Sequence, residues 1–212
     1  MALHLSCVNK GGFASLVQLW HVPQLEEETS LSPEAVLALS CWQAMVGEVV
    51  TVVDPEGTAY RARISCLDPD RASCIPLERL KAPVESQLRI EVYQSLPDKE
   101  CFELILQKLT ELGVACVVPF ESEHSVPMEE PDAQQEKSHR WPDVVKVAAR
   151  QSQRAMLPEL LPVHSFAEAL LEAGTAELKL MFCESDSSWS FTEGIGSFKP
   201  NNIALLIGPE DG

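Results

Sequence analysis

The residues best placed to bind a small molecule stand at the end of the chain, where an apolar run gives way to a glycine-rich turn. Ile203–Ile207 is followed by Gly208-Pro209-Glu210-Asp211-Gly212. A run of branched apolar residues before Gly-Pro is typical of a central strand that enters a tight loop. Open α/β sheets bind ligands through backbone amides in such loops. The sequence therefore suggests a ligand loop at 208–212, although the motif taken by itself favours an ordinary strand-ending turn.

The overall composition is that of a globular chain with an acidic surface. Its 212 residues are 45% hydrophobic and 23% charged, and the formal net charge is −16. This balance argues against a broadly basic, nonspecific nucleic-acid binder, because phosphate contacts need Lys and Arg. It leaves room for RNA contact through a local basic patch. No apolar stretch approaches the ~20 residues of a membrane span, so no membrane partner is expected.

The seven cysteines predict neither disulfides nor a metal site. They are odd in number and scattered, without a CxxC pair or a His/Cys cluster at zinc spacing. Glu121, Glu123 and His124 are too few and too close for a convincing metal site, and no metal is expected. Free cysteines in apolar runs indicate a reducing compartment, most simply the cytoplasm.

Short β-like runs dominate the first half of the chain. Val46–Val53 leads through the turn Asp54-Pro55-Glu56-Gly57 into Thr58–Ile64. In the second of these runs Arg61 and Arg63 alternate with apolar residues, which predicts a strand with one basic face. Residues 32–45 favour a short helix that Ser32 caps. The pattern is typical of a small β-barrel, followed by a linker at 79–83.

Helices and strands alternate in the second half, which is the signature of a parallel sheet. Strands are expected at 88–93, 114–120, 178–182 and 203–207. A first helix is expected to start at the capping-box-like segment Ser95–Asp98, and further helices are expected at 140–153 and 165–173. Gly113 and Gly174 stand where helices commonly end, and Ser165 with Glu168 forms a capping box. Residues 121–138 and 184–202 are expected to form loops.

Several phrases of the second half, taken in order, resemble a known enzyme family. They are Glu103–Lys108 with Thr110–Val114, Val118–Glu123, Arg140-Trp141, Ala148-Ala149 with Gln151-Ser152 and Arg154, Pro158, and Ala204–Glu210. Together, over residues 88–212, they are similar to the RsmE-type 16S ribosomal RNA methyltransferases, which are knotted enzymes of the SPOUT superfamily with an N-terminal PUA-like β-barrel.

The resemblance implies an α/β fold in two domains. Residues 1–78 would form the PUA-like β-barrel, which binds RNA. Residues 84–212 would form a SPOUT-type parallel-sheet methyltransferase domain. This second domain is expected to be C-terminally incomplete, since the family continues with a segment and a helix that complete the knot. The implied reaction is methylation of uridine N3 in 16S rRNA with S-adenosyl-L-methionine, by a cytoplasmic homodimer that acts on the small ribosomal subunit or its RNA.

The resemblance also assigns site residues. The cofactor positions are Leu206, Ile207, Gly208, Pro209, Glu210 and Gly212, and the candidates for the RNA face are Lys108, Gln151, Ser152 and Arg154. No general base is assigned, so the catalytic residue stays unknown. Two departures matter: Asp211 replaces a usual glycine, and residues 36–45 lack the family's basic residues, which predicts weakened RNA affinity. The alternatives are a non-catalytic RNA- or ribosome-associated scaffold and a truncated enzyme.

Overall fold

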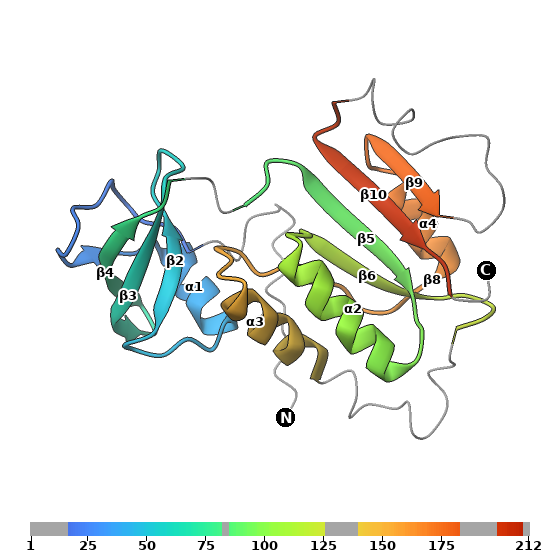
Figure 1. The fold of residues 1–212 in the computed structure, drawn as a ribbon, viewed down its shortest axis with the longest axis horizontal. Helices are drawn as coiled ribbons and strands as arrows, with labels where there is room; N and C mark the ends of the chain where they lie inside the picture. Colours follow the sequence, from blue (N-terminus) through green and yellow to red (C-terminus); the bar gives the residue numbers. More distant parts are fainter. Residues whose placement is uncertain (1–16, 82–84, 126–139, 183–198, 210–212) are drawn as a thin grey trace. The chain divides into compact units, whose positions relative to one another are not determined.

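The chain divides into two compact units (Figure 1). The computed structural model describes residues 17–81, 85–125, 140–182 and 199–209. Unit 1 comprises the chain up to Glu85 together with Ala149–Leu157, and unit 2 comprises Ser86–Ala148 and the chain from Pro158 onward. The first unit is therefore discontinuous in sequence, because a short segment from the second half of the chain belongs to it.

Unit 1 is built on a four-stranded antiparallel sheet with the order β1-β4-β3-β2. Its strands are β1 (Thr29–Ser30), β2 (Val49–Val53), β3 (Ala59–Asp68) and β4 (Arg71–Arg79), and helix α1 spans Pro33–Cys41. The helix is shorter than the predicted 32–45, but Ser32 does cap it by accepting a hydrogen bond from the Ala35 amide at 3.2 Å. Burial alternates along the first half of β3, which confirms the strand with an Arg61–Arg63 face.

Residues 17–19 contact both edges of this sheet, at β2 and just after β1. Gln18 bridges Val53 at the end of β2, and Leu19 bridges Leu31 just after β1. The Leu19 amide donates to the Val53 carbonyl at 2.8 Å, and the Ser32 amide donates to the Gln18 carbonyl at 3.0 Å. Main-chain hydrogen bonds thus continue around the unit from one edge to the other. The likeness of this unit to a PUA barrel stays a prediction.

Unit 2 contains the predicted parallel sheet, with the order β7-β6-β5-β10-β9 and with β8 also paired to β6. All of these pairings are parallel. The strands are β5 (Arg89–Ser95), β6 (Cys116–Glu121), β7 (Glu159–Leu160), β8 (His164–Ser165), β9 (Leu178–Phe182) and β10 (Asn202–Ile207). The apolar run near the chain's end is therefore a central strand, as its sequence predicts. The chain is a mixed α/β protein.

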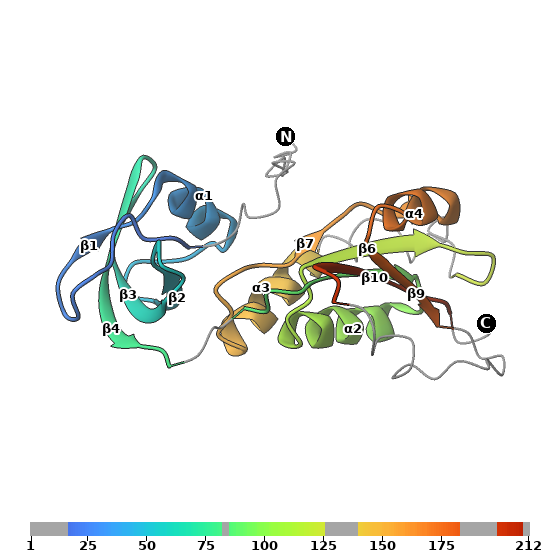
Figure 2. The same ribbon diagram turned by 90° about the horizontal axis from the view of Figure 1, so that it is seen from above.

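Helices cover both faces of the parallel sheet. The helices are α2 (Lys99–Glu111), α3 (Trp141–Gln151) and α4 (Phe166–Ala173), and Figure 2 shows α2 and α4 on opposite faces. Ala169 and Ala173 let α4 approach the sheet closely, where it packs in a core with Tyr93 and Phe120. In the described part of the chain, no helix is both long and apolar enough to cross a membrane.

Gly113 ends helix α2 in the left-handed region, with φ +92°. A Cβ at this position would meet no atom within 4 Å, so the cost of a side chain is purely that of the backbone conformation. We expect Gly113→Ala to lower the free energy of unfolding by about 1 kcal/mol, because only glycine adopts this conformation without strain. Urea unfolding measures the change, and an unchanged midpoint would contradict it.

Burial also sets the reactivity of the cysteines. Burial raises the pKa of Cys74 to about 12 and raises the pKa of Cys116 as well. At pH 8 the thiolate fraction of Cys74 is then about one part in ten thousand. We expect iodoacetamide to label the partly exposed Cys41, Cys66 and Cys101 in the native protein, and to spare the buried pair. Peptide mass mapping checks this, and early labelling of Cys74 would contradict it.

Candidate functional site

The order in which successive strands are added to the sheet reverses between the parallel strands β5 and β10. From β5 the chain passes through α2 to β6 on one side, whereas β10 pairs with both β5 and the edge strand β9 on the other side. In open parallel sheets, ligands bind beyond the carboxyl ends of the strands at such a reversal. The candidate site is therefore the carboxyl edge of β5, β6 and β10.

The register brings the ends of these three strands to the same level. Ile207 of β10 lies opposite Gln94 of β5, and Ser95 of β5 lies opposite Phe120 of β6. The next residue after Ile207 is Gly208, at the level of Ser95. The exposed Gly208 thus begins its loop beside the loop that follows β5. Without a side chain, its backbone can be approached closely by a ligand.

Three serines join the loops that follow β5 and β6. The Ser95 hydroxyl lies 2.8 Å from the Ser122 hydroxyl and 2.9 Å from the Ser125 hydroxyl, at hydrogen-bond distance. The Ser122 amide donates to the Ser125 hydroxyl at 2.8 Å, which closes a turn. Gln94, also buried, donates from its side chain to the Ser95 carbonyl at 3.0 Å. We name Ser95, Ser122 and Ser125 the serine cluster. It fixes two of the three loops at the candidate site.

The sequence reasoning placed the cofactor at the third of these loops. Leu206 is buried and Ile207 half-buried in β10, and Gly208 and Pro209 extend beyond it. Glu210 and Gly212 lie outside the described residues. The serine cluster was missed, because the sequence reasoning placed Ser95 at the start of the next helix, whereas Ser95 ends β5 and Asp98 caps α2. What pairs Ser95 with a residue 27 positions away is the register of β5 and β6, which no local pattern encodes.

Lys108, a candidate for the RNA face, lies exposed on α2 in unit 2. Its ammonium group donates to the Glu111 carboxylate at 2.8 Å, and this hydrogen bond is the main reason why the pKa of Glu111 is lowered. An exposed ion pair of this kind is weak and exchanges easily with another partner. Lys108 is therefore accessible to an anionic ligand.

Gln151, Ser152 and Arg154, the other RNA candidates, lie together in unit 1 at the end of α3 and just beyond it. Gln151 is exposed, and the Ser152 hydroxyl donates to the Ala149 carbonyl at 3.4 Å. Arg154 differs from both, because its side chain is only 4% exposed. Because this side chain is buried, a direct contact with RNA would require the surrounding structure to open.

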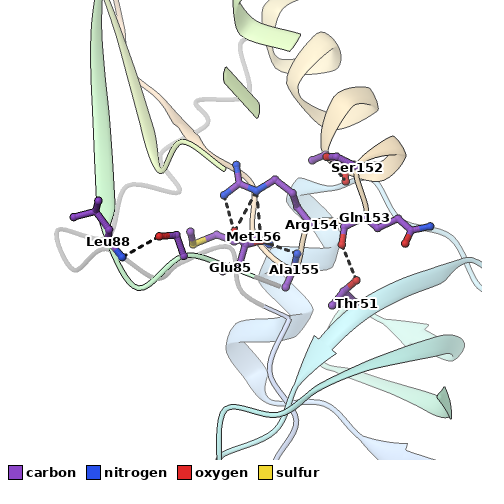
Figure 3. A network of polar contacts seen from close by, with 10 residues as sticks. Thr51, Glu85, Leu88, Ser152, Gln153, Arg154, Ala155 and Met156 are labelled. Carbon is purple, nitrogen blue, oxygen red and sulfur yellow. Dashed lines mark hydrogen bonds and ion pairs between the residues drawn. The ribbon is translucent and has the colours of Figure 1, made fainter. Parts of the chain in front are cut away.

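Glu85 holds the buried Arg154 in place (Figure 3). Arg154 Nη2 donates to Glu85 Oε2 at 2.8 Å, and its Nε lies 3.3 Å from the same oxygen. The other oxygen, Oε1, accepts the backbone amides of Ala155 at 2.8 Å and Met156 at 3.0 Å. One carboxylate thus satisfies a guanidinium and two amides. We call this arrangement the Glu85 clasp. It fastens the segment after α3 to unit 1.

Other polar groups weighed in the sequence do not form a metal site. Glu121, Glu123 and His124 are all exposed around the β6 loop. Among the described residues, no group of three His, Cys, Asp or Glu side chains could hold a metal ion. At the carboxyl edge, the described residues offer backbone amides, hydroxyls and carboxylates.

Comparison with known proteins places the chain in a family. Residues 84–212 match the family model described as an RNA methyltransferase domain. Three relatives carry the name ribosomal RNA small subunit methyltransferase E. The Bacillus subtilis protein is 29% identical over 78% of this chain and 67% of its own length. The Synechocystis protein is 28% identical over 78% and 54%, and the Aquifex aeolicus protein 28% identical over 74% and 66%. The chain thus spans between about half and two thirds of these relatives.

Solved structures agree with the match. A ribosomal RNA small subunit methyltransferase E from Neisseria gonorrhoeae, bound to S-adenosyl methionine, aligns with a TM-score of 0.56 and 27% identity, covering 92% of this chain and 79% of the other. A methyltransferase from Legionella pneumophila with bound cofactor gives 0.56 and 26%, covering 92% and 80%. The family resemblance read from the sequence is thereby confirmed. The chain belongs to the family of RNA methyltransferase domains.

Proposed function

We propose that this protein transfers a methyl group from S-adenosyl-L-methionine to N3 of a uridine in 16S ribosomal RNA. The observation that supports this most is the family match over residues 84–212. The sheet agrees with it, because Gly208 follows β10 at the carboxyl edge, next to the point where the strand order reverses. The relatives' names point to small-subunit ribosomal RNA, and the uridine N3 target follows from the resemblance to the RsmE type.

The residues at the carboxyl edge suit this cofactor. The exposed backbone at Gly208 offers polar main-chain groups without a side chain in the way. The serine cluster gives the neighbouring loops a fixed shape, so that the site is preorganised for a ligand. The exposed carboxylates of Asp98 and Glu121, which follow β5 and end β6, favour a cationic ligand.

When bound, S-adenosylmethionine supplies a methyl group already activated on a positively charged sulfonium. The protein's part is to hold the acceptor base in line with this methyl group and to accept the imide proton of uracil. In our proposal Leu206–Pro209 and the loop at 210–212 hold the cofactor, and Lys108, Gln151 and Ser152 contact the RNA. The burial of Arg154 favours a structural role, in which it supports the loop that carries Gln151 and Ser152. Catalysis as a cytoplasmic homodimer is part of the same proposal.

The proposal is tested by methyl transfer to unmodified RNA. The full chain is incubated with isotope-labelled S-adenosylmethionine and either a 16S rRNA transcript or small subunits assembled from it, and the RNA is digested to nucleosides. We expect labelled 3-methyluridine with at least one of the two substrates. Absence of label from both would overturn the proposal in favour of a non-catalytic scaffold. Label at another nucleoside would overturn the uridine N3 assignment.

A further inference from the structure

Unit 1 contains a pocket separate from the carboxyl edge of unit 2. It has a volume of about 160 Å³, and the residues that line it come from the end of α1, from β2 and β3, and from residues 149–154. All of these belong to unit 1. The volume corresponds to about five water molecules and is below the roughly 300–1,000 Å³ of pockets that hold whole small molecules. A chemical group, rather than a complete cofactor, fits this pocket.

The pocket is locally basic in a strongly acidic protein. Its lining holds three arginines, Arg61, Arg150 and Arg154, but a single glutamate, Glu48. Arg154 is already neutralised by the Glu85 clasp. Glu48 lies 3.7 Å from Arg150, which its carboxylate neutralises in part. The remaining charge of the lining is that of Arg61, which is offset in part by Glu78, its partner across the β3–β4 register and outside the lining.

Arg61 is held in position but keeps donors to spare. Its Nη1 donates to the Thr51 hydroxyl at 2.7 Å, and that hydroxyl in turn donates to the Gln153 carbonyl at 2.9 Å. The second of these bonds is drawn in Figure 3. A guanidinium carries five N–H donors in a planar fork, of which this contact uses one. Burial lowers the pKa of Arg61, because the guanidinium is partly removed from water, and the charge of Glu78 opposes this shift. An anion in the pocket would compensate for that loss.

Arg150 presents a second guanidinium to the same pocket. Its Nη2 donates to the Trp42 carbonyl at 2.6 Å and to the Gln43 carbonyl at 3.1 Å. These main-chain contacts fix the side chain, so the group is preorganised rather than free to swing. Two anchored guanidinium groups on one small pocket are the donor set that suits a phosphate.

From this geometry we infer that the pocket of Arg61 and Arg150 receives one phosphate of the RNA backbone. The inference rests on the proposed function, since it takes RNA as the substrate. A polymer suits the surroundings better than free phosphate, because the lining residue Val49 and the nearby Met45 and Val46 are exposed apolar side chains. A ribose or base on either side of the bound phosphate can cover such side chains, whereas an isolated ion leaves them in water.

The test follows the guanidinium directly by nuclear magnetic resonance. The full chain with ¹⁵N-labelled arginine is titrated with a single-stranded RNA of about ten nucleotides, within the usual size of such sites. We expect the Nε–H resonance of Arg61 to shift with RNA, and that of the exposed Arg71 to stay in place. Inorganic phosphate at the same concentration serves as the comparison. An unmoved Arg61 resonance would overturn the inference, and so would a shift with phosphate that RNA neither reproduces nor competes away.

Variants give a second, independent measure. Arg61→Gln keeps a donor for Thr51 but removes the charge, and we expect RNA affinity to fall about five- to tenfold, with the salt slope reduced by about 0.7. Arg61→Lys retains the charge and is expected to recover part of the affinity. Arg71→Gln removes the same charge on the surface and should bind as the wild type does. Equal affinities and slopes for all four proteins would contradict the inference.

The outcomes separate this inference from the proposed function. If the wild type forms 3-methyluridine but RNA does not shift the Arg61 resonance, the pocket assignment is wrong and the proposed methyltransferase function is retained. If RNA moves the resonance but no methyl group is transferred, the proposed function fails and the phosphate site stands.

Discussion

Glu85→Ala is expected to lower the free energy of unfolding of unit 1 by about 3–5 kcal/mol, since it leaves a buried guanidinium without its counter-charge. Arg154 is 4% exposed and Glu85 17%, so water cannot replace the carboxylate without opening the structure. The Ala155 and Met156 amides lose their acceptor at the same time. Hydrogen exchange of the β3 amides in unit 1 measures the loss.

Two variants sharpen this prediction. Glu85→Gln keeps one oxygen acceptor but removes the charge, so we expect an intermediate loss. Glu56→Ala removes a carboxylate at an exposed turn of the same unit and is expected to change the free energy of unfolding by less than about 0.5 kcal/mol. If Glu85→Ala behaved like Glu56→Ala, the clasp would not hold unit 1 together.

Gly208→Val is expected to weaken S-adenosylmethionine binding by roughly 30- to 150-fold, which is about 2–3 kcal/mol. The branched side chain would stand where the backbone after β10 must approach the cofactor. Because Gly208 is exposed and beyond the end of the strand, we expect the fold and its stability to be unaffected. Equilibrium dialysis with labelled cofactor measures the affinity, and circular dichroism checks the fold.

Lys179→Val provides the matched control. It places the same side chain at an exposed position within the neighbouring strand β9, away from the carboxyl edge. We expect its cofactor affinity to equal that of the wild type. A Gly208→Val protein that bound the cofactor normally would place the cofactor elsewhere.

The sequence predicted those elements whose signals are local. The apolar run at 203–207 became β10, and the Ser165–Glu168 capping box is formed as expected at the start of α4. Strand β4 was harder to recognise, since Pro76 lacks an amide and argues against a strand interior. In the structure Pro76 pairs with Ala62 beside a shift in register, where a bulge on β4 accommodates it.

Contacts between distant residues account for what could not be predicted. Glu85 and Arg154 are 69 positions apart in the sequence. No local sequence pattern predicts that residues 149–157 belong to unit 1. For the same reason Arg154 was assigned to the RNA face by resemblance, because the sequence does not show that it is buried and paired with Glu85. The cofactor loop was located because it follows a strand directly, whereas the serine cluster required the register of two strands.

The account depends most on cofactor binding at the carboxyl edge of the parallel sheet. The most direct measurement is a calorimetric titration of S-adenosylmethionine into the full chain. We predict saturable binding with a dissociation constant in the micromolar range, at about −7 to −8 kcal/mol. A titration without saturable heat at any temperature, together with no retention of labelled cofactor in dialysis, would contradict the account and leave a scaffold without methyltransferase chemistry.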